Sequence, residues 1–263
     1  MRLQLDAFAY TNKLNTIPPE QKLIFAAFVL GISLVAHPLT QGLIIIWLGI
    51  WVVVYAEIPW RIYWRSLYLV ILFWLSSLPA LVINLVPVGH VAAIQTDVYW
   101  GLALGNHYLY WGLQGSSVAL VIFLRAIAAT SCLYFVMLTI PFNALLRIFT
   151  KLGLPLVVSE ILLLMYRFIF LLLATATSLW TAQQSRLGYQ NLGRYFYSLS
   201  LLIRQLFQDT IYQYHQSYLA LQTRGFQGKF QVNNFAVYQT SPRYLLESTI
   251  GCIVLIGVEF YLQ

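Results

Sequence analysis

The chain has 263 residues, of which 60% are hydrophobic and 9% are charged, and its formal net charge is +7 at pH 7. A soluble globular domain carries roughly 25% charged residues, so this composition excludes an ordinary soluble enzyme. Several apolar runs approach the length that crosses a bilayer, about 20 residues. We therefore predict an all-α, polytopic integral membrane protein. The first 22 residues are polar and lack the pattern of a cleavable signal peptide.

The apolar segments predict about five transmembrane helices. In chain order they lie at residues 23–36, 42–56, 67–87, 113–140 and 244–262. The first two segments are short and are joined by the stretch HPLTQG, so they form either a tight hairpin or two tilted spans.

The basic residues predict the orientation, because Lys and Arg of short loops stay on the cytoplasmic side of a membrane. Lys13 precedes the first span, Arg61 follows the second and Arg147 follows the fourth, whereas the 88–112 loop contains no Lys or Arg. This alternation predicts a protein of the cell (inner) membrane with a cytoplasmic N-terminus and an outward-facing 88–112 loop.

A sixth apolar segment, 156–180, is expected to stay on the cytoplasmic side. If it crossed the membrane, one acid and six basic residues of the following segment would lie outside, against the charge rule. These residues are Asp209, Arg186, Arg194, Arg204, Arg224, Lys229 and Arg243. We therefore predict transmembrane helices in 1–140, cytoplasmic helices in 141–243 and a last transmembrane helix in 244–263.

Two of the predicted cytoplasmic helices end in an arginine. Gly225 follows Arg224 at the end of the 199–224 helix, and glycine just past a helix takes the left-handed conformation that stops it. The stretch SRLG places Arg186 at the end of the preceding helix. One such arginine would be only a C-terminal cap, favoured by the helix dipole. Two on the same side of the membrane indicate a docking device, because the planar guanidinium pairs with carboxylates.

These ends resemble the motifs of a known family. Thr-Arg-Gly-Phe-Gln-Gly at 223–228 resembles the Ala-Arg-Gly-type motif of the T component of energy-coupling factor (ECF) transporters, and SRLG at 185–188 resembles the first motif of that family. The run at 124–172 is similar to the family's central block. The opening, residues 5–23, is most similar to the CbiQ branch, which serves cobalt and sometimes nickel. The chain departs from the family pattern at Ser185 and Thr223, where alanine is usual, and at Leu187, which separates the first arginine from its glycine.

The resemblance implies a transporter of four parts. These are this non-catalytic T subunit, a substrate-capturing membrane subunit of the cobalt or nickel type and two ATP-binding ATPase subunits on the cytoplasmic side. Each arginine motif would dock in a groove of one ATPase subunit. The motif residues are Ser185, Arg186, Leu187, Gly188, Thr223, Arg224 and Gly225.

Four further charged residues are candidates for structural roles. Arg125 lies about twelve residues into its span, where a charge is costly and is expected to pair with a protein group or to reach the interface. Arg147 lies on the short amphipathic helix at 141–152. Glu160 and Arg167 are two helical turns apart and are expected to brace the cytoplasmic helices.

Other chemistry is not indicated by the sequence. The chain lacks the G-x-x-x-x-G-K-[ST] motif of an ATPase, and it shows no nucleophile–base pair and no metal-ligand spacing. We therefore expect no catalytic residue, no metal, no cofactor and no nucleic-acid partner. Two alternatives remain: a T subunit shared by vitamin-specific ECF importers, and a membrane-embedded lipid-modifying enzyme. The second is less favoured, because the eight acidic residues are dispersed along the chain.

Overall fold

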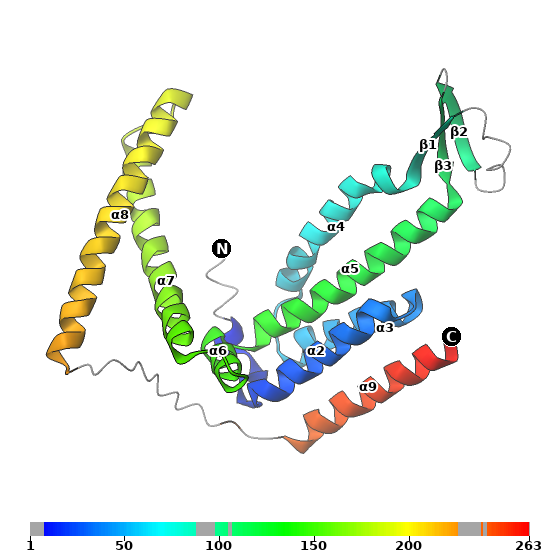
Figure 1. Cartoon of the computed structure of the whole chain (residues 1–263), viewed down its shortest axis with the longest axis horizontal. Coiled ribbons are helices and arrows are strands. Elements are labelled where there is room, and N and C mark those ends of the chain that lie inside the picture. Colours follow the sequence, from blue (N-terminus) through cyan, green and yellow to red (C-terminus); the bar gives the residue numbers. More distant parts are fainter. Residues whose placement is uncertain (1–7, 88–97, 105–106, 226–237, 239–240, 263) are drawn as a thin grey trace. The chain divides into compact units, whose positions relative to one another are not determined.

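The computed structural model describes the chain except for residues 1–7, 88–97, 105–106, 226–237, 239–240 and 263 (Figure 1). The described residues are predominantly helical, which confirms the all-α class. The chain packs as two compact units. The first contains residues 1–145 and 236–263, and the second contains residues 146–235.

The first unit is a helical bundle. Its helices are η1 (Lys13–Thr16), α2 (Pro19–Val35), α3 (Pro38–Ile50), the π-helical η2 (Trp51–Tyr55), α4 (Trp60–Val82), α5 (Leu113–Thr139) and α9 (Pro242–Leu262). Proline occupies the start of both α2 and α3, where its missing N–H would have no partner in the helix. The 23–56 region therefore forms two separate helices, joined at Ala36 and His37.

Helix α5 forms the centre of this bundle, because it packs against α2, α3 and α4. Aromatic rings fill the contact. The ring of Phe25 lies 5.2 Å from the ring of Trp51 and 5.6 Å from that of Phe135, measured between centroids. The side chain of Phe135 is fully buried. The Phe25–Phe135 pair is edge-to-face, and pairs of this geometry stabilise a core beyond the area that they bury.

Helix α9 is attached to α3 at two levels. At Gly251, an added Cβ would lie only 2.0 Å from the Trp47 ring, so the close approach of the two helices requires glycine. Towards the end of α9, the Glu259 carboxylate accepts hydrogen bonds from the backbone N–H of His37 (3.0 Å) and the hydroxyl of Thr40 (2.7 Å). A carboxylate from a distant helix therefore satisfies the N-terminus of α3.

Along the chain, a small antiparallel sheet connects α4 to α5. Its strands are β1 (Ile83–Pro87), β2 (Val98–Leu104) and β3 (His107–Gly112), in the order β1-β3-β2. The predicted span at 67–87 was therefore wrong at both ends: the helix begins at Trp60, and residues 83–87 pair with β3. Apolar composition alone could not separate a strand from the end of a helix. The part of the predicted outer loop at 88–97 and 105–106 lies outside the described residues.

Five helices are long and apolar enough to cross a membrane, among the residues that the structure describes. They are Pro38–Tyr55, Trp60–Val82, Gly115–Thr139, Leu156–Ser185 and Pro242–Leu262. The chain is thus a multi-pass membrane protein, as predicted, but the set of helices differs from the predicted one. The helix that begins at Leu156 qualifies by hydropathy, whereas α2, with 17 residues, is not in the set.

The second unit consists mainly of two long helices, α7 (Leu156–Ser185) and α8 (Leu192–Thr223), which run antiparallel after a short turn (Figure 1). Helix α6 (Phe142–Lys151) extends across the boundary of the two units. We call α6, α7 and α8 the coupling helices. Two of them differ in length from the prediction: α7 continues to Ser185, and α8 starts seven residues before 199.

Candidate functional site

Helix α7 ends in a turn that presents Arg186 to solvent. Arg186 caps the helix with φ −92° and ψ 15°, and Leu187 follows in the left-handed region with φ 58°. The N–H of Gly188 donates to the carbonyl of Gln183 (3.0 Å), and the N–H of Leu187 donates to that of Gln184 (3.1 Å). These two bonds define a Schellman motif, in which the residue after the cap must be left-handed. Leucine holds the position that usually belongs to glycine.

Helix α8 ends in the same way at Arg224. Its backbone angles are φ −91° and ψ 7°, and Gly225 follows with φ 67°. The N–H of Gly225 donates to the carbonyl of Gln222 (3.0 Å), which is equivalent to the Leu187 bond in α7. The two arginines therefore leave their helices from the same backbone conformation.

The residues before the two arginines also match. The Ser185 hydroxyl donates to the Ala182 carbonyl (2.9 Å), and the Thr223 hydroxyl donates to the Ala220 carbonyl (3.0 Å). Each hydroxyl thus bonds back into its own helix. The Ser185 and Thr223 hydroxyls are therefore satisfied within their own helices, and neither forms a hydrogen bond with the neighbouring guanidinium.

Both guanidinium groups are available for a partner. Arg186 and Arg224 are exposed, and neither makes a hydrogen bond or an ion pair within the described part of the chain. The sequence of their unit, residues 146–235, contains eight basic residues and two acidic ones. This surface is suited to bind an acidic partner.

The turn between α7 and α8 is braced by aromatic side chains. The rings of Trp180 and Tyr189 are stacked with their centroids 4.3 Å apart, and Tyr195 packs on Tyr189 at 5.4 Å. The buried Ser198 hydroxyl donates to the Gly188 carbonyl (2.9 Å). Because a Cβ at Gly188 would lie 2.7 Å from that hydroxyl, the glycine allows α8 to pack against the end of α7. The turn therefore fixes the base from which Arg186 projects.

The other predicted residues have different environments. Arg147 lies on α6, and Glu160 lies in the first turns of α7. Each of them interacts with another residue. Arg167 makes no hydrogen bond or ion pair within the described residues, and it lines a recess between α7 and α8 together with Arg224. Arg125 lies near the middle of α5 and is exposed.

Lys22, which the sequence analysis had not singled out, is almost completely buried at the N-terminal side of the bundle. Its ammonium group donates to the carbonyls of Leu14 (3.0 Å) and Thr139 (2.8 Å). Nearby, the Asn12 side-chain amide donates to the Leu138 carbonyl (3.0 Å). These bonds fasten the N-terminal segment to the end of α5, just before the coupling helices begin. No local pattern indicated this role, since the joined residues are more than a hundred positions apart.

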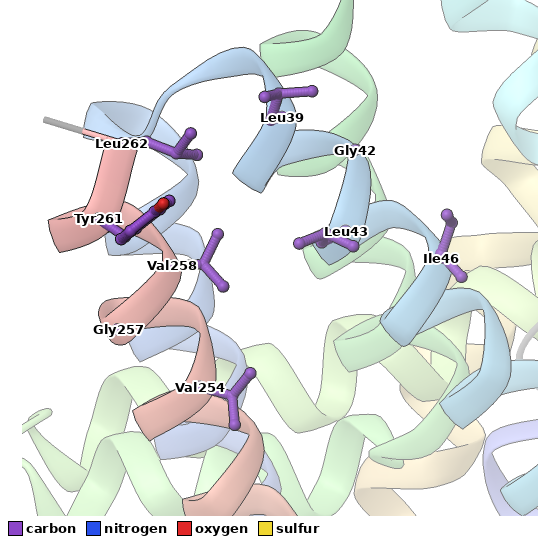
Figure 2. A pocket seen from close by; sticks show the side chains of 9 residues that line it. All are labelled: Leu39, Gly42, Leu43, Ile46, Val254, Gly257, Val258, Tyr261 and Leu262. Carbon is purple, nitrogen blue, oxygen red and sulfur yellow. The ribbon is translucent and has the colours of Figure 1, made fainter.

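The first unit also carries an apolar groove between α3 and α9 (Figure 2). It encloses about 710 Å³, and Figure 2 shows leucine, isoleucine and valine side chains facing it from both helices. Gly42 and Gly257 lie on its two walls, and a Cβ at either position would meet nothing within 4 Å. The groove offers an apolar surface on two helices that are able to cross a membrane.

Comparison with known proteins identifies a family for most of the chain. Residues 10–233 match the CbiQ family, described as cobalt transport protein. The cobalt transport protein CbiQ of Salmonella typhimurium is 24% identical over 87% of this chain and 99% of its own length. A protein of Methanocaldococcus jannaschii, named as uncharacterized, is 28% identical over 97% of this chain and 92% of its own length. A fused cobalt transport protein, CbiMQ, of Methanocorpusculum labreanum is 25% identical over 85% of this chain, which covers 36% of that longer protein.

The matched region includes the central helix α5, all three coupling helices and both arginine ends. The CbiQ family is also the branch that the opening residues 5–23 resemble. The chain therefore belongs to the CbiQ family of cobalt transport proteins.

Proposed function

We propose that this protein is the transmembrane coupling subunit of an ATP-driven cobalt importer of the ECF type. In this role it links two ATPase subunits, one at each arginine end, to a substrate-capturing membrane subunit. The observation that carries the proposal is the matched pair of helix ends. Arg186 and Arg224 share one backbone conformation, one preceding hydroxyl contact and one state, exposed and unpaired within the described residues.

The separation of the two ends supports two docking points rather than one. Helix α8 has 32 residues, and at 1.5 Å per residue it is about 48 Å long. Arg186 lies at the turn before α8 and Arg224 at its end, so a single small ligand cannot reach both. Two copies of one partner, each with the same acidic groove, fit two equivalent arginines at this distance. Each guanidinium can bind a carboxylate through two parallel hydrogen bonds.

Helix α7 is apolar enough to cross a membrane. Its neighbour α8 is polar, however, and this favours a cytoplasmic position for α7. Near its start, α8 bonds to the turn that follows α7, through the Ser198 hydroxyl and the Gly188 carbonyl. Near its end, residues of α8 line one recess together with residues of α7. If α7 spanned the bilayer, α8 would be drawn into the hydrocarbon with Arg204 and Asp209. The cost of burying such groups in lipid is several kcal/mol. We therefore place both helices on the cytoplasmic side, with the apolar surface of α7 at the membrane interface, and the N-terminus on that same side.

A membrane partner is supported by two observations. The relative named as the fused cobalt transport protein CbiMQ joins a segment similar to this chain to a further segment in one protein. In this chain, the apolar groove between α3 and α9 has no charged lining residue, and both helices are apolar enough to cross a membrane. We propose that the substrate-capturing subunit contacts the helices of the first unit, and that this chain transmits movement from the coupling helices to it.

The experiment that tests the proposal measures association and uptake together. The tagged protein is co-purified with its ATPase subunits and membrane subunit, and cobalt uptake is measured in cells. We expect Arg186→Glu and Arg224→Glu each to weaken ATPase binding, by about 2 kcal/mol or roughly thirtyfold, and the double change to abolish uptake.

Arg204→Glu is the matched control, because Arg204 is an exposed arginine in the middle of α8. It changes the same charge on the same helix and should leave binding intact. The proposal is wrong if the double variant, inserted normally in the membrane, binds ATPase subunits and takes up cobalt like the native protein.

A further inference from the structure

The end of α8 lies beside a recess. This recess encloses about 290 Å³ between α7 and α8. From α7 it is lined by Leu164, Arg167 and Phe168, and from α8 by residues that include Gln216, Leu221 and Arg224. We call it the Arg167–Arg224 recess. On each helix the lining residues recur three or four positions apart, so they form one continuous face.

The Arg167–Arg224 recess combines an apolar wall with two unpaired cations. Leu164, Phe168 and Leu221 supply the apolar surface, whereas Arg167 and Arg224 supply the charge. Neither guanidinium has a hydrogen bond or an ion pair within the described residues, and no carboxylate lines the recess. Two like charges that share one recess repel each other, and a bound anion relieves this repulsion. The charge pattern therefore favours an anionic occupant.

The surroundings of Arg186, at the opposite end of the helix pair, are different. There, Tyr189 stacks on Trp180, the Ser198 hydroxyl contacts the Gly188 carbonyl, and Arg194 contacts the side chain of Gln190 (3.5 Å). The two arginine ends thus share a backbone conformation but differ in what surrounds them.

We propose that the Arg167–Arg224 recess is a binding site for an acidic side chain of the ATPase subunit that docks at this end. The inference rests on the proposed function. It adds a second arginine, Arg167, to the docking site, and it has the partner's side chain inserting between α7 and α8. The partner's carboxylate enters between the helices, where Arg167 and Arg224 donate to its two oxygens and the Gln216 amide offers a further donor. The methylene groups of a Glu or Asp side chain lie on Leu164 and Phe168.

The size of the recess suits this occupant. Pockets for small molecules measure about 300–1,000 Å³, so a volume near 290 Å³ admits a side chain and part of its backbone turn rather than a large ligand. Arginine is suited to carboxylates because its planar fork matches the two oxygens of the acid. One ATPase subunit would then be held by a single guanidinium at Arg186, and the other by two.

A double-mutant cycle tests the inference. Binding of the ATPase subunits to the full-length protein in lipid nanodiscs is measured for Arg167→Ala, Arg224→Ala and the double variant. We expect Arg167→Ala to weaken binding roughly tenfold, and the double variant to lose much less than the product of the two single losses, since both residues hold one carboxylate. Arg167→Ala combined with Arg186→Ala should instead show a full product, because those residues serve different sockets.

Two further variants control the cycle. Arg167→Gln keeps part of the aliphatic stem and a polar end but removes the charge, so it should reproduce the loss if the variant with alanine unfolds. Arg204→Ala removes an exposed charge elsewhere on α8 and should bind like the native protein.

The outcomes separate this inference from the proposed function. If Arg186→Ala and Arg224→Ala weaken ATPase binding while Arg167→Ala and Arg167→Gln do not, the recess has no role and the coupling function stands. If none of these changes weakens binding, the coupling function itself fails. If Arg167→Ala lowers binding to phosphatidylglycerol vesicles but not to the ATPase subunits, the recess holds a lipid phosphate and the inference is overturned.

Discussion

Arg186 and Arg224 terminate successive helices with nearly the same backbone, φ −92° and ψ 15° in one and φ −91° and ψ 7° in the other. Each is followed by a left-handed residue, Leu187 or Gly225. The cap chemistry is therefore repeated although the residue after the arginine is not. The repetition indicates that the direction in which the arginine leaves the helix is what both ends preserve.

The left-handed residues predict opposite effects of substitution at equivalent positions. A non-glycine residue in this region costs roughly 1–2 kcal/mol, part of which glycine offsets by its greater freedom in the unfolded chain. We expect Leu187→Gly to stabilise the protein by about 0.5 kcal/mol and Gly225→Leu to destabilise it by about 1 kcal/mol. Reversible unfolding of the purified protein in detergent measures both. Equal signs for the two changes would contradict the left-handed assignment of one end.

The packing of α9 on the bundle is expected to depend on the absence of a side chain at Gly251. Because an added Cβ would lie 2.0 Å from the Trp47 ring, Gly251→Ala should push α9 away and destabilise the protein by about 1–3 kcal/mol. Gly257→Ala is the control on the same helix, since its Cβ would meet nothing within 4 Å. Thermal unfolding in detergent compares the two. If they unfold at the same temperature, α9 does not pack on Trp47 as described.

The attachment of the N-terminal segment to the bundle is expected to depend on the buried ammonium group of Lys22. Lys22→Met leaves the carbonyls of Leu14 and Thr139 without their donor. Loss of hydrogen bonds from a charged donor costs about 1.5–3 kcal/mol, and we expect a destabilisation of that size.

Lys13→Met is the contrasting change, because the Lys13–Glu57 ion pair is exposed on both sides. Pairs of this kind contribute little to stability. Proteolysis of the N-terminal segment and thermal unfolding measure both variants. Equal sensitivity of the two would show that the burial of Lys22 has no consequence.

The charge of Arg125 is expected to oppose insertion of α5 into the membrane. A central arginine opposes membrane insertion by about 2.5–3.5 kcal/mol, whereas leucine favours it slightly. Arg125→Leu should therefore make insertion of this helix about 3 kcal/mol more favourable, and Arg125→Lys should change it little. A glycosylation-based insertion assay of the α5 segment reads this directly. Unchanged insertion of the leucine variant would mean that Arg125 does not lie at the depth of the hydrocarbon.

The sequence by itself determined the features that depend on neighbouring residues. Helix periodicity and hydropathy predicted the class and most of the helices, and the glycine after Arg224 predicted the end of α8. Capping bonds join residues within about one and a half turns, so their pattern is visible in a short stretch. The arginine motifs and the family were recognisable for the same reason.

The tertiary structure alone decided which distant residues meet. It buries Lys22 against Thr139, brings Gly251 to Trp47 and lets Arg167 and Arg224 line one recess. Likewise, α7 reads as a span by hydropathy, and its position beside the polar α8 adds to the basic charge of the following segment as an argument against that interpretation. These outcomes follow from how helix faces pack and from the desolvation of charged groups, which depend on residues far apart in the chain.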